Sequence, residues 1–353
     1  MPKKKKIKVF LGGYTNCINA QNLNCRSLAQ HLDKSKFEVL TLSLYSGTLP
    51  SLEGVRVFNC FRPHKLSAYL GYLWGVWNAD VAYLPKGELP QFRIAVTSFF
   101  RRKNFITVEG ILDDEATANA ERIIGVDYLN YYNGFQQKYS ITAFMKQYNE
   151  AKKGLQTSNQ ILYLGTDTNR FLFEKRIQEP LTKVLMVGND LLRKGVRDYF
   201  LLAAQFSDLE FHLVGSGNNK MDVKKELESK RLTNVVYHGM ISQKRLSDLL
   251  KKVQLHVFPS RSEGFPKVTL ETACAGVPSL VYSDYGASEW ITDNKNGFVV
   301  DTLDEMKSVI SILQEDSDKL HSISKSAIAL GKSFDWKEKV KDWERVIEQL
   351  ANA

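Results

Sequence analysis

Cysteine is scarce in this sequence, which holds four among 353 residues: Cys17, Cys25, Cys60 and Cys274. None of them forms a C-x-x-C pair, the spacing that many zinc sites and redox motifs use. The cysteines therefore indicate neither a structural zinc site nor a disulfide framework. They predict a reduced, cytoplasmic chain.

Long apolar runs are also missing. The longest uncharged, apolar-rich stretch, Leu66–Ala79, falls short of the roughly 20 residues that a membrane-spanning helix needs. The basic opening Met1–Lys6 is followed by Ile7–Gly13, which is too short for the apolar part of a secretory signal and has the pattern of a strand. We therefore expect neither a spanning helix nor a leader. The favoured location is the cytoplasm, either free or peripheral on the inner face of the plasma membrane.

Acidic residues are fewer than basic ones, with 39 Asp and Glu against 48 Lys and Arg, so the net charge is +9. This excess predicts an anionic partner: nucleic acid, a phosphate-bearing substrate or an acidic membrane surface. The apolar fraction of 43% and the charged fraction of 25% are typical of globular proteins and exclude a disordered or collagen-like chain. The length predicts about two domains.

Apolar, strand-like runs alternate with helical patterns along nearly the whole chain. The expected strands are Ile7–Gly12, Phe37–Leu44, Val55–Cys60, Asp80–Leu84, Phe105–Glu109, Ile161–Leu164, Val184–Val187, Glu210–Val214, Val235–His238, Leu255–Phe258 and Pro278–Tyr282. Several are continuous apolar runs, which suits parallel strands buried on both faces. The alternation predicts two doubly wound α/β domains.

The expected domain boundary follows the turn at Tyr163–Asp167, near the charge-rich stretch Asn169–Thr182. We place the first domain at 1–168, together with the C-terminal helix at about 336–353, and the second at 169–335. Ser333–Ala353 has the pattern of a long amphipathic helix. In open parallel sheets ligands bind beyond the carboxyl ends of the strands, so every loop that follows a strand is a candidate site.

The strongest motif is the stretch 259–271, P-S-R-S-E-G-F-P-K-V-T-L-E, which follows an expected strand and opens a helix. Pro266 suits the first helical turn. The N–H groups of Lys267 and Val268 would then face a phosphate. Glu271 could accept hydrogen bonds from vicinal hydroxyls, as on ribose, and Glu263 could contact a sugar ring. In the alternative interpretation Glu263 caps the helix and Glu271 is a surface residue.

The stretch Val187–Gly195 forms a second motif, in which a strand and a glycine turn lead into a basic pair. Arg193 and Lys194 could reach a diphosphate. The alternative is an ordinary basic start of a helix, which the helix dipole disfavours.

Two further glycine loops follow strands. Gly215 lies in Val214–Gly217 and allows a ligand close to the backbone, although a simple tight turn explains it equally well. The stretch His238–Ile241 could frame the edge of a nucleobase. A structural role for His238 is the alternative.

In the first half, a flexible loop with Gly12, Gly13 and Asn16 follows the first strand and suits close packing against a substrate. Glu109 ends another strand. The acidic residues 113–115 after it could bind a metal, but a helix N-terminal cluster is the favoured interpretation.

Basic residues occur at three further places. Arg62 and Lys65 start at the carboxyl end of a strand and lead into Leu66–Trp77, which is rich in Tyr and Trp, so they suit a lipid headgroup or an acceptor phosphate. The alternative is a helix packed into its own domain. The runs Lys3–Lys6 and Arg101–Lys103 precede strands, so we expect them at the opposite, solvated edge.

The motifs together resemble the retaining GT-B glycosyltransferases of family 4, also called glycosyl transferases group 1. The resemblance rests on Gly188, Lys194–Gly195, Val214–Gly217, His238–Gly239, Pro259–Pro266, Glu271, Gly276–Pro278, Tyr285–Glu289 and Asn296–Gly297, and more thinly on Gly12–Gly13 and Leu164–Phe171. It implies the GT-B fold: two Rossmann-like domains facing across a cleft, with the C-terminal helix crossing back to the first. The second domain would hold a nucleotide-diphosphate sugar, UDP- or GDP-linked, and the first a glycan or lipid-linked acceptor.

The resemblance also implies roles for residues. Glu263, Lys194 and Glu109 would be catalytic, and the donor would be bound by Gly188, Asn189, Arg193, Gly215, His238, Gly239, Met240, Gly264, Phe265, Lys267, Val268 and Glu271. The leaving phosphate would assist the incoming hydroxyl on the same face, so the anomeric configuration is retained. Lysine and the helix dipole supply positive charge, so we expect no metal and no cofactor.

Two departures from the family pattern stand out. Asn189 occupies a position where the family usually has Arg, and Arg193 would take its place. Glu109 stands where the family often has His.

We expect a hexosyltransferase in the biosynthesis of a surface polysaccharide or lipopolysaccharide. The alternatives are a GT-B epimerase or phosphorylase, or a non-catalytic protein that binds nucleic acid. The glycosyltransferase interpretation predicts no nucleic-acid partner.

Overall fold

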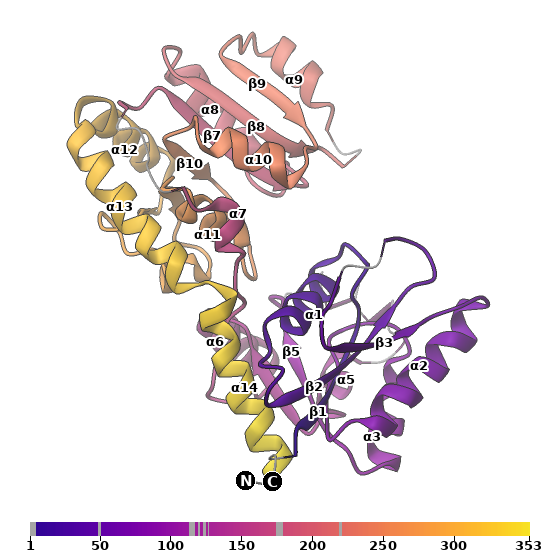
Figure 1. Ribbon diagram of the computed structural model, residues 1–353. Coiled ribbons are helices and arrows are strands. Elements are labelled where there is room, and N and C mark those ends of the chain that lie inside the picture. The colour runs from indigo at the N-terminus through magenta and orange to yellow at the C-terminus, as the bar shows by residue number, and fades with distance from the viewer. Residues whose placement is uncertain are drawn as a thin grey trace. The chain divides into compact units, whose positions relative to one another are not determined.

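The computed structural model describes residues 5–48, 51–112, 117–118, 121–122, 125, 127–173, 179–218 and 221–353. The chain divides into two compact units (Figure 1). The first combines Met1–Gly165 with Trp336–Ala353, and the second is Thr166–Asp335. The acidic residues 113–115, like Lys3 and Lys4, lie outside the described residues.

The first unit is built on a parallel six-stranded sheet with the order β3-β2-β1-β4-β5-β6. Its strands are β1 (Ile7–Tyr14), β2 (Phe37–Ser43), β3 (Val55–Asn59), β4 (Val81–Tyr83), β5 (Lys103–Val108) and β6 (Gln137–Ser140). The helices described here are α1 (Ala20–His31), α2 (His64–Asn78), α3 (Pro90–Phe99), α5 (Tyr128–Asn133), α6 (Ala143–Lys153) and α14 (Trp336–Asn352). The central strands are largely apolar and mostly buried because helices cover the sheet.

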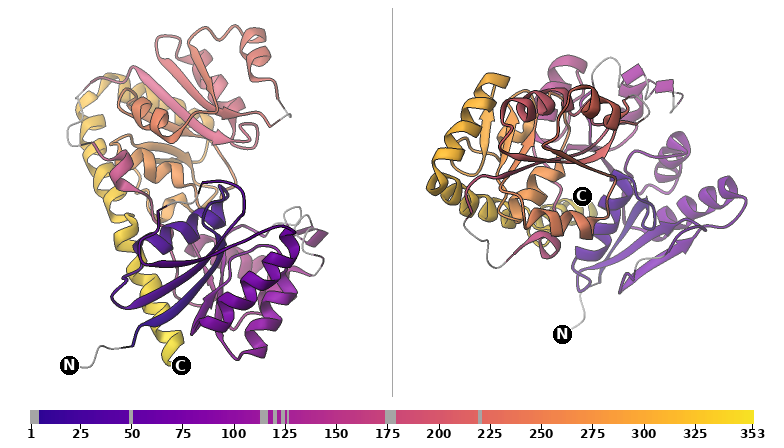
Figure 2. Two further views of the ribbon diagram at one scale, coloured as in Figure 1. Left: turned by 45° about the vertical axis from the view of Figure 1, so that its right-hand side comes forward. Right: turned by 90° about the horizontal axis from the view of Figure 1, so that it is seen from above.

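Helix α14 completes the first unit, although it follows the second in the chain. It lies against α1, β1, β4 and β5 (Figures 1 and 2, yellow). Trp343 is fully buried against the rings of Tyr83 and Phe105, and its indole nitrogen donates to the carbonyl of Tyr163 at 3.1 Å. The expected return of the C-terminal helix to the first domain is confirmed.

The second unit repeats the same plan. Its parallel sheet has the order β12-β11-β10-β7-β8-β9. The strands are β7 (Lys183–Asn189), β8 (Glu210–Ser216), β9 (Val235–Gly239), β10 (Leu255–Phe258), β11 (Ser279–Tyr282) and β12 (Phe298–Val300). The helices are α7 (Thr168–Phe171), α8 (Val196–Gln205), α9 (Val223–Ser229), α10 (Gln243–Leu250), α11 (Lys267–Cys274), η1 (Gly286–Glu289), α12 (Leu303–Glu315) and α13 (Ser317–Ser333). Two Rossmann-like sheets confirm the expected fold class.

Each sheet has a topological switch point, where consecutive connections leave in opposite directions. It falls between β1 and β4 in the first unit and between β7 and β10 in the second. Open α/β sheets bind ligands at this point, beyond the carboxyl ends of the strands.

Several expectations about single elements are wrong. Ile161–Leu164 is not a strand, and only the N–H of Leu162 reaches β6, donating to the carbonyl of Ser140 at 3.0 Å. The sixth strand is instead β6, whose short, polar sequence carries little strand signal. The terminal helix begins at Trp336 rather than Ser333, because α13 extends to Ser333 and the chain breaks its helix there.

Candidate functional site

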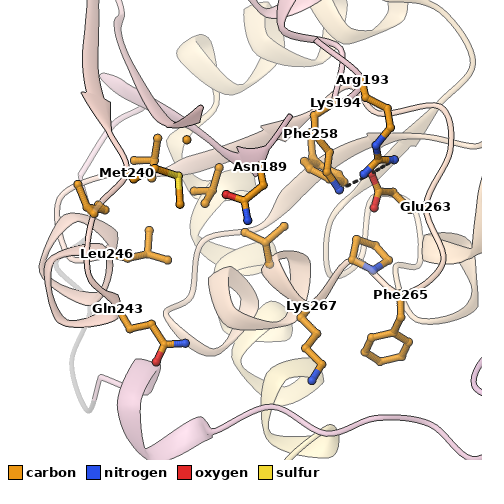
Figure 3. Close-up of a pocket in the computed structure, with 17 residues that line it drawn as sticks. Asn189, Arg193, Lys194, Met240, Gln243, Leu246, Phe258, Glu263, Phe265 and Lys267 are labelled. Atoms are coloured by element: carbon orange, nitrogen blue, oxygen red, sulfur yellow. Dashed lines mark hydrogen bonds and ion pairs between the residues drawn. The ribbon is translucent and has the colours of Figure 1, made fainter. Parts of the chain in front are cut away.

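The second unit has a pocket of about 370 Å³ at its switch point (Figure 3). It opens beyond the ends of β7, β8 and β10 and is closed by α10 and α11. The lining residues are Val187, Gly188, Asn189, Arg193, Lys194, Val214, Gly215, Met240, Ile241, Gln243, Leu246, Phe258, Glu263, Phe265, Pro266, Lys267 and Val268. Loops far apart in the sequence therefore converge on one cavity.

An ion pair lies in one wall of this pocket. Lys194 Nζ lies 2.5 Å from Glu263 Oε1, and both side chains are largely buried, with 13% and 7% of their surface exposed. The Lys194 ammonium also lies 5.1 Å from the centre of the Phe258 ring. Burial lowers the pKa of Lys194, while the Glu263 carboxylate counteracts the shift. The lysine is a partly desolvated cation held at a fixed place.

Two more donors converge on the same carboxylate oxygen. Ser260 Oγ donates to Glu263 Oε1 at 2.6 Å, and Arg193 lies 3.4 Å from it. Arg193 also donates to the carbonyl of Ser262 at 2.7 Å, while about half of its side chain stays exposed. The result is a preorganised cluster of two cations and one carboxylate, suited to a ligand with both phosphate and hydroxyl groups.

Glycines let the strand ends approach one another beneath the pocket. Gly215 has a φ of +139°, and a Cβ there would lie 1.8 Å from the carbonyl oxygen of Gly188. Gly195 has a φ of +80°, and a Cβ there would lie 2.0 Å from the carbonyl oxygen of Pro259. No larger side chain fits at either position, so these two glycines fix the shape of the bottom of the pocket, which we call the pocket floor.

Helix α11 opens differently from the expectation. Pro266 is the N-cap and not part of the first helical turn, with a ψ of 81°. The N–H of Lys267 donates to the carbonyl of Phe265 at 2.9 Å, so it is not free to bind a phosphate as predicted. Glu263 does not cap this helix. The positive charge that faces the pocket comes from side chains, among them Lys194, Arg193 and Lys267, and from the helix dipole.

Glu271 lies one turn into α11 and does not line the pocket. Burial raises the pKa of its carboxyl group, and the charges of Lys267 and Arg170 act in the opposite direction. Arg170, from α7, also hydrogen-bonds the side chain of Gln243 in the pocket wall. Sequence reasoning missed Arg170 and Gln243, because neither lies in a recognisable motif.

His238 and Gly239 lie outside the pocket lining, whereas Met240 contributes to it. His238 stacks on His212, with 2.9 Å between His238 Nε2 and His212 Nδ1. Burial lowers the pKa of both imidazoles. These contacts favour the structural interpretation of His238. Gly264, another predicted binding residue, also lies outside the lining.

The first unit has a smaller pocket of about 200 Å³ at its own switch point. It is lined by Gly12, Tyr14, Cys17, Asn19, Asn22, Leu44, His64, Tyr72, Pro85, Lys86, Gly87 and Glu88. Glu88 hydrogen-bonds the hydroxyl of Tyr14, and its other oxygen lies 3.0 Å from His64 Nε2. This phenol–carboxylate–imidazole chain was missed from the sequence, because Tyr14 and Glu88 lie 74 residues apart.

The predicted glycine loop has mainly structural contacts. A Cβ on Gly13 would lie 2.7 Å from the sulfur of Cys25, so close packing requires this glycine. Gly12 lines the pocket. The Asn16 side chain bonds backbone groups of Leu44 and Ser46 and fixes the loop after β2.

Glu109 lies just beyond the end of β5, as expected. Its oxygens accept hydrogen bonds from Asn24 at 3.1 Å, from Tyr83 at 3.2 Å and from Thr107 at 2.8 Å. These hydrogen bonds fix the orientation of the Glu109 carboxyl group.

The described residues contain no group of three or more His, Cys, Asp and Glu side chains that could hold a metal ion. Among the same residues, no helix is long and apolar enough to cross a membrane.

Comparison with known proteins relates the second unit to a family. Residues 167–329 match the family described as glycosyl transferases group 1, and this region includes every part of the second-unit pocket. The second unit is therefore similar to this family, and the expected resemblance is confirmed over residues 167–329.

Curated relatives align with part of the chain. The poly(glycerol-phosphate) alpha-glucosyltransferase of Bacillus subtilis is 25% identical over 158 residues, which is 44% of this chain and 23% of that protein. Two other relatives are matched over 48% and 40% of their own lengths. The chain thus spans at most about half the length of these curated relatives.

Solved structures match nearly the entire chain. Sucrose-phosphate synthase from Thermosynechococcus elongatus superimposes with a TM-score of 0.77 at 13% identity, covering 98% of this chain and 99% of that one. Anabaena HepE, solved with UDP-glucose, gives a TM-score of 0.75 at 18% identity and covers 98% and 100%. These likenesses show the GT-B fold.

Proposed function

We propose that this chain is a retaining glycosyltransferase of the group 1 family that uses a UDP-sugar as donor. The observation that carries the proposal is the Lys194–Glu263 pair in the pocket at the switch point of the second unit. A structural relative, Anabaena HepE, has been solved in complex with UDP-glucose, which supports UDP over GDP as the nucleotide.

In the proposed complex the donor diphosphate binds Lys194 and Arg193. An ammonium has three donors, so Lys194 can bond a phosphate oxygen while it keeps its bond to Glu263. The free Glu263 oxygen can accept a hydrogen bond from a hydroxyl of the donor sugar. Glu271 accepts hydrogen bonds from the ribose, and the pocket floor at Gly215 admits the nucleotide close to the backbone.

The proposed transfer step retains the anomeric configuration of the donor sugar. The bond between the anomeric carbon and the β-phosphate oxygen breaks, and its electron pair stays with UDP. The acceptor oxygen bonds to the anomeric carbon on the same face, and its proton passes to an oxygen of the leaving phosphate. Lys194 and Arg193 stabilise the charge that grows on this phosphate, so they lower the barrier.

We propose that the first unit binds the acceptor in the pocket between β1 and β4. Tyr14, Glu88 and His64 can donate to and accept from hydroxyl groups, so they suit a glycan or the glycan part of a lipid-linked acceptor. Glu109, held by three donors, is proposed as a further contact to the reacting sugars. The place of the product in a surface polysaccharide or lipopolysaccharide is part of the same proposal.

The test is donor hydrolysis across a panel of UDP- and GDP-sugars, measured without acceptor. We expect one or a few UDP-sugars to be hydrolysed and to raise the melting temperature. Lys194→Ala should lower turnover by roughly 100-fold, because a stabiliser of the leaving group is lost. Glu271→Ala should weaken UDP binding by about tenfold or more.

The control is Lys224→Ala, which removes an exposed lysine of α9. It should change neither the turnover nor the affinity for UDP. Equal activity of the Lys194 and Glu271 variants would overturn the site assignment. If no sugar nucleotide stabilises the protein while single-stranded nucleic acid does, the enzymatic proposal itself is wrong.

A further inference from the structure

Helix α2 has two apolar faces, which is unusual for a helix at the surface of a sheet. Its inner face, with Ala68, Tyr72 and Val76, is fully buried against the strands. Its outer face carries Leu66, Leu70, Leu73 and Trp77, which are 53%, 41%, 38% and 58% exposed. The outer face of a surface helix is ordinarily polar, and packing in the core of the first unit does not account for these four exposed apolar side chains. We call them the apolar stripe of α2.

The stripe follows helical geometry. Steps of four, three and four residues place its four side chains on one face along the whole helix. Helix α3 packs beside α2 at the margin of the unit (Figure 1). Phe99, at the end of α3, is 80% exposed. Phe100 joins it to Trp77, with ring centres 5.0 and 4.8 Å apart.

Basic residues border the stripe at both ends. At the start of α2, Lys65 is exposed and Arg62 lies over the ring of Tyr45 at 4.8 Å. At the other end, Arg102 donates to the carbonyl of Trp77 at 3.1 Å, and Arg101 is exposed. The sequence predicted only a solvated edge at residues 101–103, but the structure adds an aromatic cluster beside them.

Acidic residues are few around this surface. The segments 61–79 and 89–108, which supply α2, α3 and β5, contain no Asp or Glu. Of the two acidic residues that adjoin them, Asp80 accepts a hydrogen bond from the N–H of Lys8, and Glu88 contacts Tyr14 and His64. The surface therefore combines an apolar centre, aromatic side chains and cations at both ends. This combination is complementary to an anionic lipid bilayer, where cations meet headgroup phosphates and apolar side chains enter the acyl boundary.

We propose that the outer face of α2, with Phe99 and the flanking cations, docks the protein on an anionic membrane. The helix lies in the plane of the interface and does not span, because its 15 residues reach about 22 Å against a hydrocarbon core of roughly 30 Å. Docking requires no sugar donor, so it stands or falls independently of the proposed activity.

The experiment is vesicle flotation of the full chain with phosphatidylcholine alone and with a mixture of phosphatidylcholine and phosphatidylglycerol. We expect binding to the mixed vesicles only, weakened by added salt. Leu70→Gln with Trp77→Gln should lower binding at least about tenfold, because the inserted apolar area is lost. Lys65→Gln with Arg101→Gln should lower it about 25-fold, at roughly fivefold for each cation.

The matched control is Leu201→Gln with Lys224→Gln in the second unit. Leu201 is about as exposed as Leu66, and Lys224 is an exposed lysine, so loss of binding there would contradict a specific face. Donor hydrolysis without vesicles should be unchanged in the Leu70 and Trp77 variant, which separates failed docking from a failed donor site.

Three results would overturn the proposal. The first is unchanged vesicle binding of the Leu70 and Trp77 variant, and the second is no binding of the wild type to mixed vesicles. The third is a wild-type dimer in light scattering that this variant converts to a monomer, because a second copy of the chain would then cover the face.

Discussion

Lys194 and Glu263 form a largely buried ion pair across the switch point of the second unit, with 2.5 Å between Nζ and Oε1. Lys194 comes from the loop after β7, and Glu263 from the loop after β10. The pair therefore joins the two halves of the sheet at the place where the pocket opens. It fixes a cation whose burial would otherwise favour the neutral amine.

The charged state of Lys194 depends on the Glu263 carboxylate, and removing that carboxylate tests this. Glu263→Ala leaves Lys194 without its strongest anionic partner, so we expect the free energy of unfolding to fall by about 2 kcal/mol. UDP supplies a replacement anion, and it should raise the melting temperature of the variant more than that of the wild type. Thermal denaturation with and without UDP measures both effects. Glu228→Ala, at an exposed position, serves as control. Equal shifts with UDP would show that the diphosphate does not reach Lys194.

The raised pKa of Glu271, a half-buried residue, predicts a pH-dependent stability. Burial raises its folded pKa above the unfolded value, so ionisation at neutral pH costs stability, and the cost disappears as the pH falls below the ordinary value of about 4.3. Glu271→Gln should therefore raise the free energy of unfolding near pH 7 and give no gain near pH 4. Denaturant unfolding at the two pH values tests this, with the exposed Glu315→Gln as control. A gain of the same size at both would rule out ionisation as the cause.

The pocket floor should not tolerate a methyl group at Gly215. Gly215→Ala forces its Cβ against the carbonyl oxygen of Gly188 at a positive φ, so we expect a loss of at least about 2 kcal/mol. Gly239→Ala is the matched control, because Gly239 also has a positive φ but no atom within 4 Å of the added Cβ. The Gly239→Ala variant should lose only about 1 kcal/mol of the free energy of unfolding. Urea denaturation compares the two variants, and similar losses would mean that the positive φ, and not the contact with the Gly188 carbonyl, causes the destabilisation.

Glu109 should matter for turnover more than for stability. Glu109→Gln keeps the shape of the side chain but replaces one accepting oxygen with a donor, opposite Asn24. We expect kcat to fall about tenfold or more, with little change in the KM for the UDP-sugar or in the melting temperature. The exposed Glu53→Gln should leave kcat unchanged. An unchanged kcat in the Glu109 variant would show that Glu109 takes no part in the reaction.

The sequence predicts buried parts of this fold well and its edges poorly. Strand β10 is confirmed at its expected bounds, Leu255–Phe258, because a buried strand in a parallel sheet is apolar on both faces. Strand β6 was missed because it is a polar edge strand, and the apolar Ile161–Leu164 was mistaken for it. Part of that segment's burial comes from α14, whose Trp343 bonds to the carbonyl of Tyr163.

The same contrast holds for the pockets. The motif around Glu263 was found because its residues are consecutive and follow a strand. The contribution of Phe258 and Gln243, and the chain from Tyr14 through Glu88 to His64, depend on loops that only folding brings together. Spacing in a single sequence carries no signal for such contacts.

The division of the chain has a consequence for the order in which the protein is made. The second unit is one uninterrupted segment, but the first is completed by α14, which the ribosome adds after residues 166–335. Until then Tyr83 and Phe105 lack the buried Trp343 that covers them. The core of the first unit can therefore be completed only after the whole second unit has been synthesised, although the first unit begins first.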